Sequence, residues 1–259
     1  MIVKIYDTHA HLDQLEDLDQ ALQAADEAGV AGIVAISMDL ASCRKNLEIK
    51  EKYKRPDIYL GLGMHPSEAK PSDLEEIIKL IYEHKDRIHV IGEIGLDFWY
   101  KWIKKDEAKK DEQRQVFKRL LEVAKDLRLP AVIHSRGAWK ECLQTAVDVG
   151  VEKAEFHWYS GPLDVLGEIL TRGYYVSTGP SVAYSPQSRE AMRHAPIERT
   201  LIETDCPVFY RDPQTQEGFQ AQPKDVWRAL KAYCALKDLE EQKGLGILNE
   251  NARTFFHFN

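Results

Sequence analysis

The stretch Tyr6-Asp7-Thr8-His9-Ala10-His11-Leu12 decides how this chain is interpreted. It follows the apolar residues 2–5 and precedes a segment with helical spacing, so it is expected where a first strand ends. Side chains alternate between the two faces of a strand, and His9 and His11 therefore project the same way, with Asp7 behind them. Two imidazoles on one face can bind one metal ion, and a preceding carboxylate can orient them. An isolated pair of this kind is also common in exposed loops, so the rest of the chain has to discriminate between the two interpretations.

Length and composition favour one large core. The chain has 259 residues and is 44% hydrophobic, which suits two small domains or one barrel of about 250 residues. No Gly/Ser/Pro-rich linker or low-complexity tract marks a boundary, so a single domain over residues 1–259 is predicted. The first strand begins almost at Met1 and no apolar run approaches the roughly 20 residues of a membrane helix. We therefore expect no signal peptide and no contact with a membrane.

The cysteine pattern indicates the compartment of the protein, and its net charge limits the ways in which it can bind nucleic acid. Four cysteines are scattered without C-x-x-C spacing, which is typical of unpaired thiols in a reducing cytoplasm. The net charge of −7 argues against broad coating of nucleic acid, because such binding depends on Lys and Arg neutralising phosphates. An enzyme that grips one strand end through bound cations remains compatible with this charge. A cytoplasmic protein without an obligate protein partner is expected.

Strand-like runs recur eight times, each followed by a helical pattern. The strands are expected at residues 2–7, 32–37, 58–66, 90–97, 131–136, 154–159, 174–179 and 201–205. A capping box is predicted at residues 72–75, before the third helix. Eight β-then-α units in a chain of this length indicate an α/β protein with a (β/α)8 TIM barrel. A doubly wound open sheet is the alternative.

Candidate metal ligands recur at the ends of these strands, where a barrel of this kind has its active site. The six candidates are His9, His11, Glu93, His134, His157 and Asp205. Singly, each has an ordinary explanation as a solvated carboxylate, a core histidine or a helix cap. Their common placement favours a divalent metal, since charged and imidazole groups crowded at one barrel mouth need partners.

Four imidazoles and two carboxylates are enough to hold two metal ions with positions left open. Glu93 can bridge them with one oxygen to each ion. Two ions about 3.5–4 Å apart can activate a water and clamp the oxygens of a phosphoryl group, and their excess positive charge favours an anionic substrate. Asp205, at the end of the eighth strand, lies beside the first strand in a closed barrel and is placed to accept a proton from the attacking water.

Six motifs occur in the order found in the TatD family of metal-dependent deoxyribonucleases. They are Asp7–Asp13 (DTHAHLD), Gly63–Pro66 (GMHP), Gly92–Asp97 (GEIGLD), His134–Arg136 (HSR), His157–Gly161 (HWYSG) and Glu203–Pro207 (ETDCP). The closing Asn249–Phe256 resembles the C-terminal helix of that family. The resemblance covers essentially the whole chain and implies a TIM-barrel hydrolase of the amidohydrolase type.

The resemblance also implies a cofactor, a substrate and a role for each motif residue. The cofactors would be two divalent ions, Mg, Mn or Zn, and the substrate a nucleic acid, DNA or RNA, bound at a strand end. His9 and His11 would hold one ion, Glu93 would bridge, His134 and His157 would hold the second, and Asp205 would bind metal and take the proton. His65 and Arg136 would contact the phosphate. The ordinary alternatives for these two are a turn histidine before Pro66 and a salt bridge at the barrel rim.

Two loops leave the substrate preference open. The family usually has a short basic loop containing Asn-Glu-Pro after the last acidic motif, whereas here Phe209-Tyr210-Arg211-Asp212-Pro213 runs on to Gln222-Pro223. After the fourth strand, the aromatic residues of Phe98–Trp102 either stack on bases at a strand end or pack against the barrel. Cys206 is expected to be a buried thiol and not a ligand.

Three functions remain in competition. A 3′-to-5′ DNA exonuclease is favoured. The second is a C–N or ester hydrolase on the same barrel, including one that removes a misplaced amino acid from tRNA. Many cyclic-amide hydrolases on this barrel bridge their metals through a carboxylated lysine at the fourth strand, and Glu93 in place of a lysine weighs against them. The third is a non-catalytic nucleic-acid-binding relative, which would be expected to have lost ligands.

Overall fold

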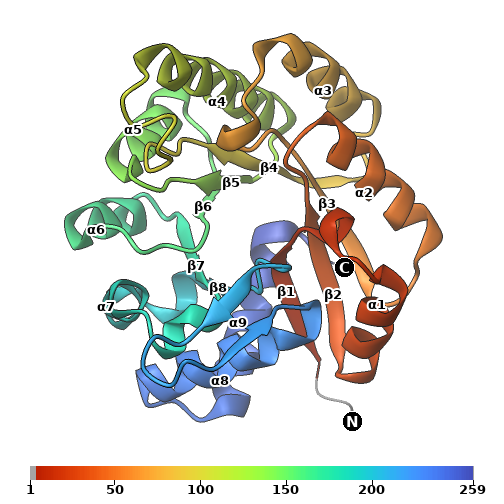
Figure 1. The fold of residues 1–259 in the computed structure, drawn as a ribbon, viewed down its shortest axis with the longest axis vertical. Coiled ribbons are helices and arrows are strands. Elements are labelled where there is room, and N and C mark those ends of the chain that lie inside the picture. The colour runs from red at the N-terminus through yellow and green to blue at the C-terminus, as the bar shows by residue number, and fades with distance from the viewer. Residues whose placement is uncertain (1–3, 259) are drawn as a thin grey trace.

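The computed structural model describes residues 4–258, and in it eight parallel strands follow one another in chain order around a barrel (Figure 1). The strands are β1 (Ile5–Ala10), β2 (Val30–Ile36), β3 (Asp57–Leu62), β4 (Ile88–Gly95), β5 (Ala131–His134), β6 (Ala154–Phe156), β7 (Tyr175–Thr178) and β8 (Thr200–Ile202). Each is paired in parallel with the next. The predicted (β/α)8 class is confirmed.

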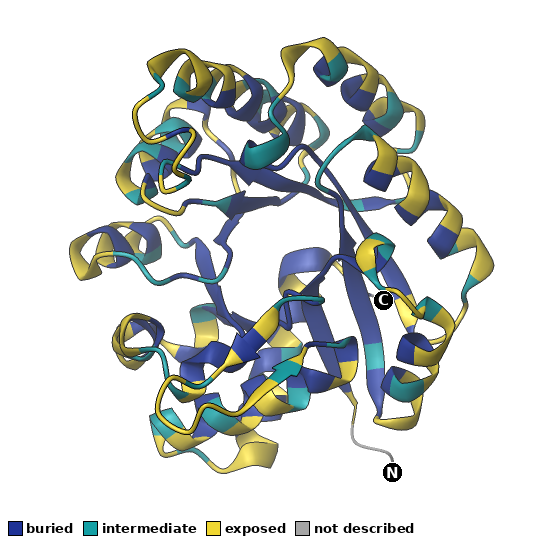
Figure 2. Cartoon of the chain, in the orientation of Figure 1, coloured by how far each residue is buried: buried dark blue, intermediate teal, exposed yellow. Residues whose placement is uncertain are grey.

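Helices surround the strands and bury their apolar faces against them (Figure 2). The helices are α1 (Leu18–Glu27), α2 (Leu40–Lys52), α3 (Pro71–Glu83), α4 (Glu107–Leu127), α5 (Trp139–Val149), α6 (Leu163–Thr171), α7 (Pro186–His194), α8 (Val226–Lys237) and α9 (Glu241–Phe256). In α4 the residues Val116, Leu120 and Ala124 are buried. Their i, i+4 spacing places them on one stripe of the helix, which is why this charged segment packs on the barrel. None of the helices within residues 4–258 is long and apolar enough to cross a membrane.

The barrel closes between β1 and the segment that follows β8. The Asp205 amide donates to the His9 carbonyl at 2.9 Å, and the His11 amide donates to the Cys206 carbonyl at 2.8 Å. Ala10 and Cys206 form a parallel bridge between these bonds. Closure therefore brings the last acidic motif directly against the His-x-His segment.

The barrel interior near the N-terminal ends of the strands is filled by apolar side chains from alternating strand positions. Inward residues of β2, β4 and β5 pack with Phe255 and Phe256 at the end of α9 and with Phe258 just beyond it. Those phenyl rings close the N-terminal end of the strands, and α9 is seen behind the barrel in Figure 1. The C-terminal end of the strands gathers the buried imidazoles and most of the carboxylates near them.

The observed boundaries correct several expectations. Residues 2 and 3 of the predicted first strand lie outside the described residues, and β1 runs on to Ala10, so His9 lies within the strand. Strands β3, β6 and β8 end before the polar motif residues that follow them. The predicted capping box at residues 72–75 is wrong: α3 begins at Pro71 after Lys70, without a side-chain cap. Proline fits this first position because the missing N–H has no partner there in any case.

The departure from the family loop is a two-stranded hairpin between β8 and α8. Its strands are β9 (Phe209–Arg211) and β10 (Gly218–Gln220), paired antiparallel. The Tyr210 hydroxyl is buried beneath the hairpin and donates to the Thr204 carbonyl at 2.8 Å. This bond fastens the hairpin to the barrel next to the last acidic motif.

Candidate metal centre

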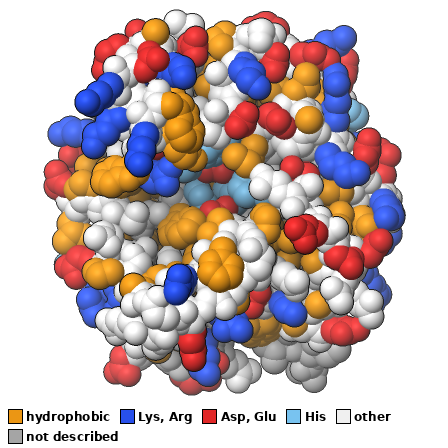
Figure 3. All heavy atoms as spheres, viewed as in Figure 1, with side chains coloured by type: hydrophobic (Ala, Val, Ile, Leu, Met, Phe, Trp, Pro, Cys, Tyr) orange, Lys and Arg blue, Asp and Glu red, His pale blue; other side chains and the backbone are white. Residues whose placement is uncertain are grey.

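A hollow at the C-terminal end of the strands gathers the polar motif residues, and Figure 3 shows imidazole and carboxylate side chains within it. All six predicted ligands and His65 contribute to one buried cluster. They come from β1 (His9), the residue after it (His11), the segment after β3 (His65), β4 (Glu93), β5 (His134), the segment after β6 (His157) and the segment after β8 (Asp205). The structure therefore brings the six residues singled out from the sequence together at one end of the barrel.

Glu93 lies between two groups of imidazoles. Its Oε2 atom is 3.4 Å from His9 Nε2 and 3.7 Å from His11 Nε2. Its Oε1 atom is 2.8 Å from His134 Nδ1 and 3.6 Å from His157 Nε2. Each carboxylate oxygen thus faces a different pair of nitrogen donors, which is the arrangement a bridging ligand needs.

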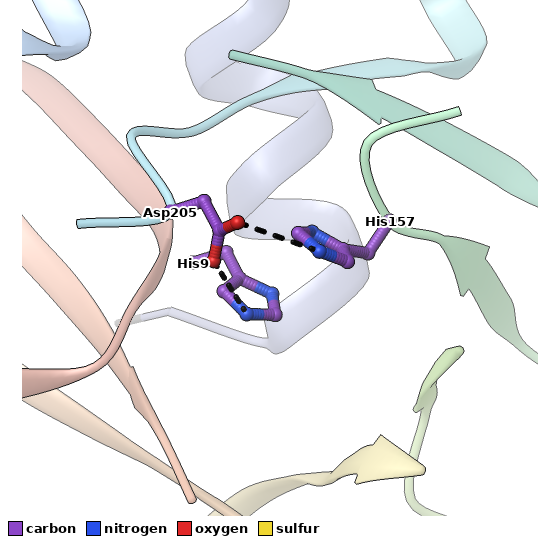
Figure 4. Close-up of side chains that lie close together, drawn as sticks. All are labelled: His9, His157 and Asp205. Carbon is purple, nitrogen blue, oxygen red and sulfur yellow. Dashed lines mark ion pairs between the residues drawn. The ribbon is translucent and has the colours of Figure 1, made fainter. Parts of the chain in front are cut away.

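Asp205 faces the His9 side of the cluster (Figure 4). Its Oδ1 atom lies 3.6 Å from His9 Nε2 and 3.3 Å from His11 Nε2, and its Oδ2 atom lies 4.0 Å from His157 Nε2. The backbone of Asp205 is left-handed, with φ +48°, a conformation that aspartate tolerates better than most residues. The amide bond to His9 described above holds it there.

The outward nitrogens of two histidines have fixed partners. His11 Nδ1 lies 3.2 Å from the Ile36 carbonyl, and His157 Nδ1 lies 3.1 Å from Glu203 Oε1. Glu203 is itself held by the Ser177 hydroxyl, which donates to Oε2 at 2.6 Å. The Ile36 carbonyl and the Glu203 carboxylate favour a hydrogen on the outward nitrogens, which leaves the lone pair of each inward nitrogen for a metal.

Asp97 holds the third oriented histidine. Its Oδ2 atom lies 2.8 Å from His134 Nε2 and accepts the Arg136 Nε hydrogen at 2.8 Å. The nitrogen of His134 that faces Glu93 is therefore Nδ1. Gly95 allows β4 to approach β5 at this point, since a Cβ atom there would collide with the His134 carbonyl.

His65 presents an N–H group to the cluster. The Ser67 amide donates to His65 Nδ1 at 3.0 Å, so in the neutral ring the hydrogen is on Nε2. Burial lowers the pKa of His65 to about 3, which keeps the ring neutral. Nε2 lies 3.8 Å from Glu93 Oε1 and 3.3 Å from His134 Nδ1. Proximity alone would admit His65 as a ligand, but a protonated Nε2 is a hydrogen-bond donor, which agrees better with the predicted phosphate contact.

Arg136 forms the rim salt bridge that was the alternative to a phosphate contact, and part of its side chain is also exposed. Its Nε is paired with Asp97, and its guanidinium stacks over the Tyr100 ring at 4.5 Å. Its side chain is 44% exposed at the barrel mouth. The rim salt bridge is therefore present, and the exposed part of the guanidinium remains available to a ligand.

Within the described residues Asp7 makes no hydrogen bond to the imidazole of His9 or His11, contrary to the expectation from its place before them. Its carboxylate accepts the Thr204 amide at 2.9 Å and the Thr204 hydroxyl at 2.6 Å, and it accepts the His9 backbone amide at 3.4 Å. Strand alternation predicts the common face correctly but does not determine which polar group lies on the neighbouring strand. Burial raises the pKa of Asp7 well above its usual range, against the effect of the Thr204 bonds.

The electrostatics of the cluster depend on protons shared between imidazoles and carboxylates. Burial opposes charge on His157, but the negative charges of Glu203 and Glu93 outweigh it and raise the pKa of His157 well above its usual range. Burial likewise opposes charge on Glu93, yet the neighbouring imidazoles of His65 and His157 and the bond to His134 hold the pKa of Glu93 well below its usual range. A metal ion at this place would displace imidazole protons.

Two orienting carboxylates received no role in the sequence interpretation, although both lie inside quoted motifs. Asp97 is four residues after Glu93, and Glu203 is two residues before Asp205. An even spacing along an extended segment places side chains on the same face, and this signal was available for both. What could not be known was which histidine each would meet.

The donor atoms suit a divalent metal. Three sets of donors lie within 4.8 Å of one another: His9 with His157 and Asp205, His9 with His11 and Glu93, and His65 with Glu93 and His134. Imidazole nitrogen and carboxylate oxygen are common ligands of Zn²⁺ and other transition metals. Several buried groups of the described chain can thus hold metal.

Comparisons with known proteins place the chain in a family. The profile of TatD-related DNases matches residues 6–257. The chain is 30% identical to the uncharacterized metal-dependent hydrolase YabD of Bacillus subtilis, over 98% of this chain and 100% of that protein. It is 29% identical to human deoxyribonuclease TATDN3, over 98% of this chain and 95% of that protein.

A solved structure agrees with the fold. The crystal structure of YJJV, a TatD homologue from Escherichia coli K12, superposes with a TM-score of 0.89 and 24% identity, covering all of both chains. The family match spans nearly the whole chain and includes each segment that contributes to the buried cluster. This protein belongs to the TatD family of metal-dependent hydrolases.

Proposed function

We propose that this protein is a metal-dependent deoxyribonuclease that removes nucleotides from DNA 3′ ends with two divalent ions. The observation that carries the proposal is the position of Glu93, whose two oxygens face separate pairs of nitrogen donors. The name of the human relative, a deoxyribonuclease, supports the choice of substrate.

The proposed ligand sets are assigned from the distances to Glu93. His9 and His11, near Oε2, would hold one ion with Asp205, and His134 Nδ1 and His157 Nε2, near Oε1, would hold the other. When bound, the ions supply Lewis acidity toward phosphoryl oxygens and lower the pKa of water. The nitrogen-rich donor set favours Zn²⁺ over Mg²⁺ and Mn²⁺, which prefer oxygen ligands.

The remaining steps belong to residues of the chain. Asp205 takes the proton of the attacking water, since its carboxylate lies at the mouth beside both His9 and His11. His65 donates its Nε2 hydrogen to a phosphate oxygen, and Arg136 binds the same group through the exposed part of its guanidinium. Asp97 fixes the positions of His134 and Arg136 together.

A substrate panel tests this function. The metal-depleted protein, reloaded with Mg²⁺, Mn²⁺ or Zn²⁺, is offered end-labelled single- and double-stranded DNA, RNA and an aminoacyl-tRNA. Stepwise shortening of DNA from the 3′ end that stops in chelator is expected. Deacylation of the aminoacyl-tRNA without DNA loss would instead establish the ester hydrolase. Binding without any hydrolysis would establish the non-catalytic relative.

We also propose that the protein works as one domain in the cytoplasm without an obligate protein partner. The four cysteines are buried and unpaired, and Cys206 is among them as predicted. Unpaired thiols are typical of a reducing compartment, and this supports the choice.

A further inference from the structure

The loop between β4 and α4 combines aromatic and basic side chains at the barrel mouth. Residues 98–105 read Phe-Trp-Tyr-Lys-Trp-Ile-Lys-Lys and begin directly after Asp97. We call this segment the aromatic loop. On the side of the hollow where Figure 1 places it, Figure 3 shows Lys or Arg side chains next to hydrophobic ones.

Part of the aromatic loop packs and gives it a defined shape. The Phe98 ring lies beneath Lys110 Nζ at 5.3 Å and the Arg114 guanidinium at 5.1 Å, and Ile103 is buried. The Ile103 amide donates to the Tyr100 carbonyl at 3.0 Å, which forms a turn. For Phe98, packing is therefore the right alternative of the two considered for the aromatic residues.

Tyr100 continues a stack that begins at the metal centre. One face of its ring meets the Arg136 guanidinium, and the Trp102 ring lies 4.4 Å from it with an interplanar angle of 20°. Arg136 in turn is bound to Asp97, which holds His134. The stack therefore leads from a proposed metal ligand to the indole of Trp102.

Two indoles of the loop remain exposed to solvent. Trp99 is 63% exposed and Trp102 is 54% exposed. The Lys104 ammonium lies 5.7 Å from the centre of the Trp99 ring. Within residues 4–258, no carboxylate lies within 4.0 Å of the amino groups of Lys101, Lys104 or Lys105. Exposed aromatic faces beside uncompensated cations match the faces of nucleobases and the charge of their phosphates.

The position of Trp99 is tied to the metal centre. Its amide donates to Asp97 Oδ1 at 2.9 Å, and the neighbouring Phe98 amide donates to the Arg136 carbonyl at 3.1 Å. A single carboxylate thus fixes both His134 and the start of the aromatic loop. The position of Trp99 relative to the buried cluster is therefore fixed.

We propose that the aromatic loop is the platform on which unpaired bases of the substrate strand stack, with Trp99 and Trp102 as the stacking residues. Lys101, Lys104 and Lys105 bind the neighbouring phosphates. A base inside a duplex has both faces covered by its neighbours, so the platform accepts single-stranded segments. This inference rests on the proposed function and specifies the form of its substrate.

A binding experiment isolates the contribution of the bases. Metal-depleted protein in chelator is titrated into two labelled oligonucleotides of about 12 nucleotides, one of thymidines and one of abasic sites with the same phosphates. Wild-type protein is expected to prefer the thymidine strand. Trp99→Ala and Trp102→Ala should each reduce that preference about 5- to 100-fold, and Trp99→Phe should retain most of it.

Two controls separate stacking from other effects. Tyr82→Ala removes an exposed aromatic side chain of the outer helix α3 and should leave the preference at the wild-type value. A triple Lys101, Lys104 and Lys105 to Gln variant should weaken both oligonucleotides equally. Its log affinity should fall less steeply with log salt, by about 0.7 for each phosphate that the variant no longer binds.

The outcomes distinguish this inference from the proposed function. Equal affinity of wild-type protein for both oligonucleotides, or an unchanged preference in both alanine variants, overturns the platform. DNA hydrolysis together with such a result leaves the proposed function standing. A clear base preference that depends on Trp99 and Trp102, with no hydrolysis under any metal, retains the platform and overturns the nuclease.

Discussion

At the scale of a single residue, Asp205 has the most specific proposed role, that of proton acceptor. It lies within reach of His9, His11 and His157, and its left-handed backbone is held by a bond to β1. A purely structural aspartate here would cap the segment that follows, and asparagine would replace it well. A proton acceptor cannot be replaced in this way.

Asp205→Asn should therefore fold and, once loaded with metal, lose rate by on the order of 10²–10⁴. The change keeps the shape of the side chain but removes its ability to accept a proton. Single-turnover hydrolysis of labelled DNA, with metal content measured on the same sample, checks this. Asp164→Asn, an exposed residue at the start of α6, is the matched control. A metal-loaded Asp205→Asn protein within a few-fold of wild type would assign the residue to structure.

Glu155 is a second residue with an unusual environment. It lies in β6, fully buried, and its two carboxylate oxygens have no hydrogen-bond partner within residues 4–258. Burial, and then the negative charge of Glu203, raise the pKa of Glu155 from 4.5 to about 8. Below the lower value both folded and unfolded chains hold this proton. Between the two values only the folded chain does, so the contribution to stability falls as pH rises.

Glu155→Gln should remove the fall in stability that the titration of Glu155 causes as pH rises. We expect the free energy of unfolding of the metal-free variant to change less between pH 5 and pH 8 than that of wild type. At pH 8 the variant should be more stable by on the order of 1–3 kcal/mol. Denaturant unfolding of both proteins at the two pH values measures the difference. Parallel pH profiles would show that Glu155 is already compensated in the folded state.

At the scale of elements, the alignment of β4 with β5 determines which residues Asp97 can bond. Asp97, just beyond β4, meets His134 at the end of β5, Arg136 and the amide of Trp99. Asp97→Asn should lower affinity for the metal on the His134 side by about 10- to 100-fold, as is typical when an orienting carboxylate is lost. Metal titration of the purified variant checks this.

Arg136→Gln is the control for Asp97, because it removes the other partner of the carboxylate. It should leave metal content unchanged and weaken only substrate turnover. If Arg136→Gln lowered metal affinity as much as Asp97→Asn, the effect would come from the arginine and not from the orientation of His134.

The elements also show how far sequence reasoning reaches. The common direction of His9, in β1, and His11, the residue directly after it, was predicted from strand alternation, and the recurrence of eight strand patterns was enough for the barrel. The three-residue β6 ends before His157, so alternation could not place that ring. Its position depends on Glu203, which is 46 residues away in sequence but adjacent in the barrel. The β9–β10 hairpin carried no family pattern and went unpredicted.

At the scale of the whole molecule, the fold depends on closure of the barrel between its first and last strands. The Asp7 carboxylate accepts two bonds from Thr204 across this seam. Thr204→Val has a similar shape but leaves the buried carboxylate with one bond fewer, which costs about 1–3 kcal/mol. Thermal or denaturant unfolding should show this loss in a single transition.

Thr145→Val provides a matched comparison for the seam. The Thr145 hydroxyl donates to the Glu141 carbonyl within α5, so its loss leaves no charged group unsatisfied. Its effect on the free energy of unfolding should be within about 0.5 kcal/mol, the range of ordinary surface changes. Equal destabilisation by the two substitutions would mean that the Thr204 hydroxyl bond to Asp7 contributes no more to the free energy of unfolding than the Thr145 bond does.

The central claim is that Glu93 joins two metal positions, and the number of Mn²⁺ ions bound per chain tests it most directly. Equilibrium binding is measured at equal free Mn²⁺ for wild type, Glu93→Gln and, as control, Glu141→Gln on α5. Two ions are predicted for wild type and for the control. Glu93→Gln should lose at least one, because an amide carries no charge and bridges poorly. One ion in wild type, or two retained in Glu93→Gln, would contradict the account.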